Sequence, residues 1–166
     1  SYNNDGTDQI GSTVQDNMIG LSHDFDGDND YVDIPNVASL ENVQEEKYTV
    51  SACFKPDIVP PDNDTDDEAF GIVMKMGYHI GLTYRANSTF RMQHWITGWS
   101  SRHAESENTF STGTYHHVAG TLDTASGIVS VYVNGVLEDT ARFAPGTATG
   151  EYNTTTWKIG VARPNQ

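Results

Sequence analysis

The feature that most constrains the fold is a repeated alternation of apolar and polar side chains over short segments, with no amphipathic helical repeat among them. Five segments of strand length carry the alternation, at 48–56, 78–85, 90–98, 115–123 and 127–135. Turn-forming residues lie between them, including "RANST" at 85–89, "DTASG" at 123–127 and "NG" at 134–135. Many short strands joined by tight turns predict an all-β protein, either a sandwich or a jelly roll.

Length and charge limit the partners of the chain. Its 166 residues are enough for one all-β domain with its own core. The 9 Lys and Arg residues stand against 23 Asp and Glu residues, which gives a formal net charge of −14. Such a surface repels phosphate backbones and anionic lipids, and no apolar run is long enough to span a bilayer. We therefore expect no nucleic-acid partner and no membrane insertion, although solubility or a salty habitat also explains the acidity.

Residues that could carry catalysis are few. Glycoside hydrolysis needs two carboxylates on one strand face, as in an E-x-D-x-E run, and the sequence has no such run. Glu45 and Glu46 would point to opposite faces, and "ESE" at 105–107 is typical of a polar turn. His116 and His117 are adjacent in a predicted strand, so they cannot bind one ion together and one of them should pack inward. We expect that the chain is not an enzyme.

The predicted hairpin at 78–98 presents two different faces. The core side carries apolar residues and one histidine, namely Tyr78, Ile80, Leu82, Tyr84, Phe90, Met92, His94 and Ile96. The opposite side carries polar residues around one indole, namely His79, Thr83, Arg85, Arg91, Gln93 and Trp95. An aromatic plane surrounded by planar polar groups is typical of sugar binding, so this side is the predicted glycan-binding face.

The two arginines of that face leave alternatives open. Arg85 and Arg91 would favour a sugar that carries a carboxylate or sulfate, because guanidinium donates paired hydrogen bonds to such anions. Alternatively, Trp95 covers the sheet and the arginines pair with local carboxylates, among which are Glu105 and Glu107. A second contact at the edge of the face is expected from Trp99 and Arg102, in the predicted loop "GWSSRH" at 98–103.

The order of five motifs resembles a known family. They are "NNDGT" at 3–7, "FDGDNDYVDIPN" at 25–36, "YTVSACFKPD" at 48–57, "YHHVAGTLDTASGIVSVYVNGVLED" at 115–139 and "WKIGVARP" at 157–164. Together they are similar to the laminin-G-like domains of the concanavalin A-like lectin/glucanase superfamily. The resemblance implies a two-sheet antiparallel jelly roll over 1–166, as a module or fragment of a larger extracellular or cell-surface protein.

The sequence departs from that family in two respects. Members usually have a strand before the first motif and another after the last, and both are absent here. Because their loss would expose sheet edges, we expect either a fragment of a longer protein or a homodimer that completes the sheet. Cys53 stands where the family commonly has Trp; as the one cysteine, it forms no internal disulfide, and its apolar neighbours predict a buried, unreactive thiol.

Acidic residues concentrate at 24–33, with a second cluster at 62–68 that we expect to be a mobile surface loop. Neither cluster has EF-hand spacing, because the required Gly and Glu positions hold other residues. The resemblance instead implies a structural calcium ion in the first cluster, with Asp26, Asp28, Asn29 and Asp30 as ligand candidates. The alternative is a solvated acidic turn that Phe25 and Tyr31 anchor to the core.

These observations lead to one functional hypothesis and one rival. The chain is expected to be a non-catalytic, lectin-like module that binds a glycan or polysaccharide, with a structural calcium ion at the acidic turn. The rival is a cell-surface adhesion or structural module that binds protein partners through an apolar patch or an open sheet edge.

Overall fold

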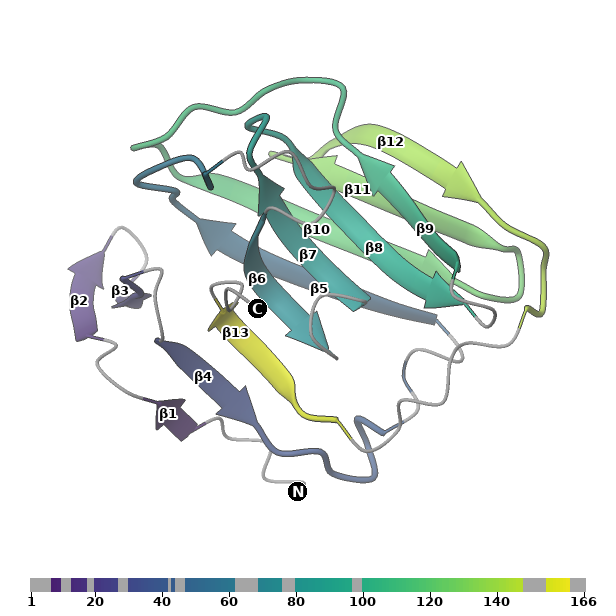
Figure 1. Ribbon diagram of the computed structural model, residues 1–166, viewed down its shortest axis with the longest axis horizontal. Helices are drawn as coiled ribbons and strands as arrows, with labels where there is room; N and C mark the ends of the chain where they lie inside the picture. Colours follow the sequence, from purple (N-terminus) through teal and green to yellow (C-terminus); the bar gives the residue numbers. More distant parts are fainter. Residues whose placement is uncertain are drawn as a thin grey trace.

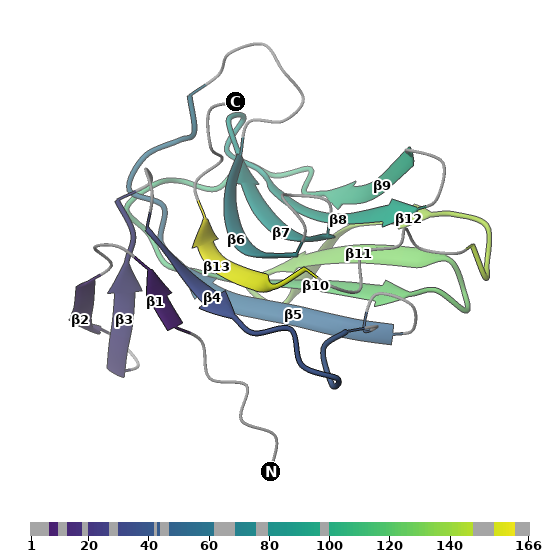
Figure 2. The ribbon, with the colours of Figure 1, turned by 60° about the horizontal axis from the view of Figure 1, so that its bottom comes forward.

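The structure is a computed structural model, and it describes residues 7–9, 13–17, 20–26, 30–41, 43, 47–61, 69–75, 80–96, 100–147 and 155–161. Two antiparallel sheets pack face to face in this part of the chain (Figures 1 and 2). The expected all-β architecture of two antiparallel sheets is confirmed. No helix of the described residues is long and apolar enough to cross a membrane.

The larger sheet has seven strands. Their order is β1 (Thr7–Gln9), β4 (Tyr31–Ile34), β13 (Trp157–Val161), β6 (Ala69–Lys75), β7 (Ile80–Arg85), β8 (Phe90–Ile96) and β9 (Ser100–Glu105). The neighbours β4 and β13 are far apart in sequence, so the sheet joins the two ends of the described chain.

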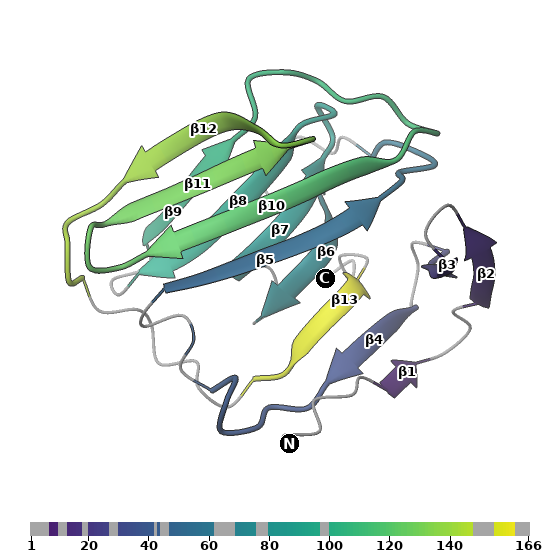
Figure 3. The same ribbon diagram turned by 180° about the vertical axis from the view of Figure 1, so that it is seen from behind.

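The smaller sheet has four strands, which Figure 3 shows from the side opposite to Figure 1. Their order is β12 (Val136–Arg142), β11 (Ile128–Val133), β10 (His116–Asp123) and β5 (Lys47–Phe54). A separate hairpin of β2 (Thr13–Asn17) and β3 (Gly20–Asp24) lies at one side of the sandwich (Figure 1).

The turns between the strands agree with the sequence. The Arg85 amide donates to the Thr89 carbonyl and closes the β7–β8 hairpin. At the β11–β12 turn, Asn134 and Gly135 have φ angles of 52° and 81°, the left-handed conformation that an Asn-Gly pair tolerates. The five predicted strands are confirmed, but the predicted loop at 98–103 is wrong, because Ser100–Glu105 is strand β9. Its polar composition reflects its place at the edge of the sheet, because among the described residues β9 pairs with a strand on one side, β8.

The core lies between the sheets. The residues of the predicted hairpin that were assigned to the core and are described here are all buried, at 8% exposure or less: Ile80, Leu82, Tyr84, Phe90, Met92, His94 and Ile96. They pack against Val118, Leu122 and Val131 of the smaller sheet. Gly120 allows this close approach, because a Cβ built there would overlap the Met92 thioether. Trp157 of β13 is buried as well, at 5% exposure.

Two predictions about single residues have opposite outcomes. His116 is buried, and its Nε2 lies 3.0 Å from the Ser111 carbonyl oxygen while His117 is exposed, so one imidazole packs inward as expected. Cys53, in contrast, is exposed and not buried. Alternation along β5 turns its neighbours toward the core and Cys53 outward, where it pairs in register with His117.

Candidate functional site

The outer face of the seven-stranded sheet is the face that the sequence proposed for sugar binding. The register brings Arg91 of β8 beside Glu105 of β9, and Gln93 beside His103. Trp95 follows on the same side of β8, because alternate residues of a strand share a face. Gln93 and Trp95 are half-buried and His103 is exposed, so the three side chains form an accessible polar and aromatic strip.

Arg91 is held by Glu105. The guanidinium Nη2 and Nε lie 2.5 Å and 2.8 Å from Oε2 of Glu105, while Thr89 and Asn87 donate to Oε1. Burial alone would raise the pKa of Glu105, but the hydrogen bonds from Thr89, Asn87 and Arg91 lower it from 4.5 to about 2. Glu105 is therefore ionised and neutralises Arg91, as the alternative from the sequence has it. The structure gives no support to Arg91 as a receptor for an anionic sugar.

The remaining predicted residues of this face are distributed differently. Thr83 is only 2% exposed, so it does not contribute to an accessible surface. Arg85 is half-buried at the end of β7, opposite Ala69. Arg102 lies in register with the buried His94, on the other side of the sheet from Gln93. The prediction that Arg102 forms a second contact at the edge of the glycan-binding face is therefore wrong about where Arg102 lies. His79 and Trp99 lie outside the described residues.

His103 is the residue of this face that sequence reasoning missed. The signal was the alternation in "SSRHAE" at 100–105, which becomes visible once this segment is recognised as a strand. Partial burial and the charge of Arg91 lower the pKa of His103. Its imidazole is thus neutral at neutral pH and offers one donor and one acceptor to a ligand.

The acidic turn holds one buried carboxylate. Asp30 is 4% exposed; its Oδ2 accepts a hydrogen bond from the Asp26 amide at 3.3 Å. Its Oδ1 is buried and has no hydrogen-bond partner among the described residues. Asp28 and Asn29 lie outside those residues, and the described part of the chain contains no group of three or more His, Cys, Asp or Glu side chains that could hold a metal.

The flanks of the acidic turn are anchored by β13. Phe25 packs its ring against Gly160, where a Cβ would overlap the ring and where φ is +73°. The Lys158 ammonium lies 3.5 Å from the centroid of the Tyr31 ring, a cation–π contact. Phe25 and Tyr31 are therefore half-buried anchors of the turn, the role that the alternative of a solvated acidic turn gives them.

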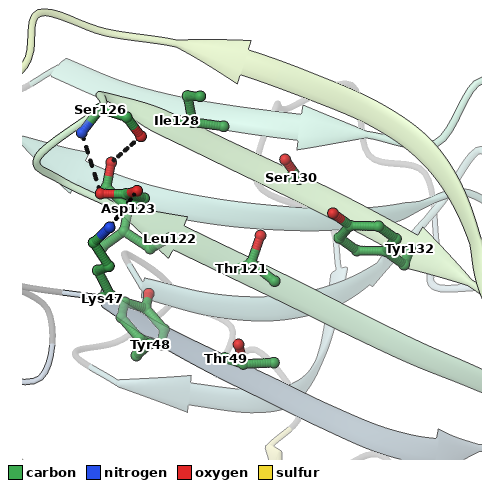
Figure 4. Close-up of a pocket in the computed structure, with 10 residues that line it drawn as sticks. All are labelled: Lys47, Tyr48, Thr49, Thr121, Leu122, Asp123, Ser126, Ile128, Ser130 and Tyr132. Atoms are coloured by element: carbon green, nitrogen blue, oxygen red, sulfur yellow. Dashed lines mark hydrogen bonds and ion pairs between the residues drawn. The ribbon is translucent and has the colours of Figure 1, made fainter.

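A second surface, which sequence reasoning did not identify, is an open groove of about 470 Å³ on the outer face of the four-stranded sheet (Figure 4). It is lined by hydroxyl groups, the half-buried ring of Tyr132 and an ion pair. The lining residues are Lys47, Tyr48, Thr49, Thr121, Leu122, Asp123, Ser126, Ile128, Ser130 and Tyr132. The available signal was the outward half of each alternating strand, which is rich in threonine and serine.

A third surface is an apolar cleft of about 480 Å³ beside β5. Phe54, Phe70 and Ile159 line it together with Phe25 and Tyr115, which come from separate parts of the chain. Ile58, at its margin, is 62% exposed. Within the described residues β5 is the last strand on this side of the four-stranded sheet.

Comparison with protein families gives one match. The family described as the concanavalin A-like lectin/glucanases superfamily matches residues 26–166. No curated protein matches the sequence.

Solved structures of similar fold include several binding domains. The binding domain of Paraclostridial Mosquitocidal Protein 1 aligns with a TM-score of 0.68 and 12% identity over 99% of this chain and 45% of that one. Domain 4 of AbnA, a GH43 extracellular arabinanase from Geobacillus stearothermophilus in complex with arabinotriose, has a TM-score of 0.58 and 18% identity, covering 92% and 68%. The CBM40 of the Ruminococcus gnavus IT-sialidase, bound to α2,3-sialyllactose, has a TM-score of 0.55 and 13% identity, covering 75% and 73%. At these identities the likeness concerns the fold.

Proposed function

The chain belongs to the concanavalin A-like lectin/glucanases superfamily, and from this premise we propose that it is a non-catalytic carbohydrate-binding module with its sugar site on the outer face of β8 and β9. The observation that carries the proposal is the strip of Gln93, Trp95 and His103 on adjacent strands of one sheet. An indole contacts the C–H face of a pyranose, and an amide and an imidazole exchange hydrogen bonds with its hydroxyls.

The ligand proposed for this strip is an uncharged sugar. Arg91 is already neutralised by Glu105, so an anionic group would have to displace a carboxylate that also holds Asn87 and Thr89. The whole protein also has a net charge of −14, which disfavours the approach of polyanions. Both effects select for hydroxyl-rich, neutral glycans.

Known structures of this fold support a binding role. The structure of the arabinanase domain is a complex with arabinotriose, and that of the sialidase module is a complex with α2,3-sialyllactose. A module of this kind serves a secreted or cell-surface protein by holding it on a glycan, so an extracellular or surface location is part of the proposal.

Calcium is proposed as a structural ion at the acidic turn. A buried carboxylate oxygen without a hydrogen-bond partner in the described residues is costly unless a cation or proton neutralises it, and Asp30 Oδ1 is such an atom. The oxygen donors Asp26 and Asp30, with Asp28 and Asn29 as further candidates, suit a hard cation such as calcium. When bound, the ion would supply only positive charge that fixes the turn.

A second candidate function is favoured by the cleft beside β5. An adhesion or structural module would bind protein there. The exposed Ile58 offers an apolar contact, and β5, the last strand on its side of the sheet among the described residues, offers an edge for strand addition. A homodimer through this edge is the form to test first. Light scattering that gives twice the 18.2 kDa chain mass would support it, and a monomer mass at high concentration would remove it.

The test of the carbohydrate proposal is a glycan array that carries neutral and anionic glycans, probed once with calcium and once with chelator. We expect binding to a related set of neutral glycans, with at least tenfold loss in Trp95→Ala and in Gln93→Ala. Leu137→Ala is the control, because Leu137 is 53% exposed on β12, away from this face. Absence of binding under both conditions would favour the protein-binding alternative.

A further inference from the structure

The groove on the four-stranded sheet has a floor of hydroxyl groups in register. Thr49 of β5 lies opposite Thr121 of β10, which lies opposite Ser130 of β11, and Ser130 lies opposite Thr140 of β12. The Ser130 and Thr140 hydroxyls are hydrogen-bonded at 3.0 Å. Because neighbouring strands are about 4.8 Å apart, this row crosses the whole sheet over roughly 14 Å.

The two ends of the groove are different (Figure 4). At one end the Lys47 ammonium lies 2.8 Å from Asp123 Oδ2, while the Ser126 amide donates to Asp123 Oδ1 at 3.1 Å. At the other end stands Tyr132, whose neighbour in register on β10 is the small Ala119. A small neighbour leaves one face of the tyrosine ring uncovered by a bulky side chain.

The charges in the groove are balanced. The hydrogen bond and charge of Lys47 lower the pKa of Asp123 to about 2, so this carboxylate is ionised and paired. Lys47 and Asp123 are the ionisable pair among the lining residues, and their charges cancel. The groove therefore offers neither a net positive site for an anion nor a spare carboxylate for a metal.

We infer that this groove is a second carbohydrate site, which takes an uncharged, extended glycan along the hydroxyl row with one sugar ring on Tyr132. The hydroxyls of Thr49 and Thr121 donate and accept along the chain of the glycan, while the buried Ser130 hydroxyl, which is hydrogen-bonded to Thr140, supports the row. The Lys47–Asp123 pair binds hydroxyls at the far end with one donor and one acceptor. Apolar ligands are disfavoured, because they would cover these hydroxyls without hydrogen bonds.

The two surfaces lie on opposite sides of the sandwich. The β8–β9 strip faces outward from one sheet and the groove faces outward from the other (Figures 1 and 3). Two sites that face away from each other can bind two glycan chains at once, or two segments of one folded chain. Binding to an insoluble or branched polysaccharide is then stronger than binding to a short oligosaccharide, because the second contact is intramolecular.

The test locates binding residue by residue. Amide chemical shifts of the 166-residue chain are recorded while arabinotriose, xylohexaose and laminarihexaose are added separately. For at least one probe we expect shifts at 47–49 and 121–132. The apparent affinity should fall at least fivefold in Tyr132→Ala and in Thr49→Val, but stay unchanged in Ile58→Ala, because Ile58 is 62% exposed and does not line the groove. Thr49→Val removes a hydroxyl but keeps the branched shape of an exposed side chain, so it should fold normally. It therefore tests the groove even if Tyr132→Ala does not fold.

The outcomes separate this inference from the proposed function. Shifts confined to residues of β8 and β9, abolished by Trp95→Ala, would retain the first site and overturn the groove. Shifts confined to the groove would retain the inference and overturn the placement of the first site. Shifts in neither region with any of the three probes would overturn both.

Discussion

His94 and Phe143 pack ring against ring inside the core, with 5.8 Å between the ring centroids. The His94 side chain is 0% exposed, and neither of its ring nitrogens has a hydrogen-bond partner among the described residues. Burial lowers the pKa of His94 from 6.5 to about 4, because an imidazolium ion would lose its hydration there. The histidine is thus a neutral core residue, and its proton affinity is coupled to folding.

Acidification is therefore expected to destabilise the protein as the pH falls from 6.5 to about 4. In this window the unfolded chain binds a proton at His94 that the folded chain does not, so stability is complete above the window and lost within it. The shift corresponds to roughly 3 kcal/mol. The free energy of unfolding, measured with denaturant at several pH values in this range, should change clearly less with pH in His94→Leu than in the wild type. Equal changes in the two proteins would assign the pH dependence to other groups.

Lys75 fixes the chain after β4 to the sheet. Its side chain is buried, and Nζ donates to the carbonyl oxygens of Leu40 and Glu41, at 2.9 Å each. Lys75→Met should reduce the free energy of unfolding by about 2 kcal/mol, because the Leu40 and Glu41 carbonyl groups lose a charged donor. Thermal unfolding of this variant can be compared with Lys55→Met, whose parent side chain is 37% exposed. A loss no larger than in Lys55→Met would show that water replaces the ammonium group.

The core could be predicted from the sequence because alternation of side chains is a local property. Residues such as Leu82 and Met92 have a period of two within one strand, and each was assigned to the core correctly. The prediction for Cys53 was wrong because it did not apply this rule: the apolar neighbours suggested burial, although alternation places them and the thiol on opposite faces. Strand β9 was missed because an edge strand needs few apolar residues.

The candidate sites depend on contacts that sequence does not encode locally. The Arg91–Glu105 pair joins two strands, and only their register decides whether Arg91 is engaged. The hydroxyl row from Thr49 to Thr140 joins four strands that span much of the chain. Each of these threonines alone is an ordinary strand residue, so the row becomes visible only with the pairing of the sheet.

Cys53 is exposed on the outer face of β5, so it should react with a soluble thiol reagent in the native protein. One equivalent of thiol is expected to be modified without denaturant, because the chain contains a single cysteine. Absorbance of the released aromatic thiolate measures the rate. A thiol that reacts only after denaturation would mean that another surface covers β5, and the rate should then depend on protein concentration if the cover is a second copy.

Calcium should raise the melting temperature and chelator should lower it, if the ion occupies the acidic turn. The effect is expected to disappear in Asp30→Asn, which keeps the shape of the side chain but removes the buried charge. Asp57→Asn is a matched control, because Asp57 is an exposed carboxylate in a different loop. Melting temperatures that do not respond to either addition would leave the turn as an acidic turn without a metal.

Glu105→Gln should change the sugar preference of the β8–β9 strip. The amide keeps hydrogen-bonding atoms for Asn87 and Thr89 but no longer neutralises Arg91, so the guanidinium becomes available to carboxylate or sulfate groups. Binding to sialylated or sulfated glycans on the array should rise at least fivefold relative to wild type. The Glu105 carboxyl, whose pKa is lowered from 4.5 to about 2, stabilises the wild type above this window, and the wild type loses that contribution as the pH falls through it. The variant lacks the carboxyl, so it should be less stable than the wild type above pH 4.5 and should show less of this loss on acidification. An unchanged glycan profile together with this stability change would show that Arg91 does not contact the sugar and only supports the sheet.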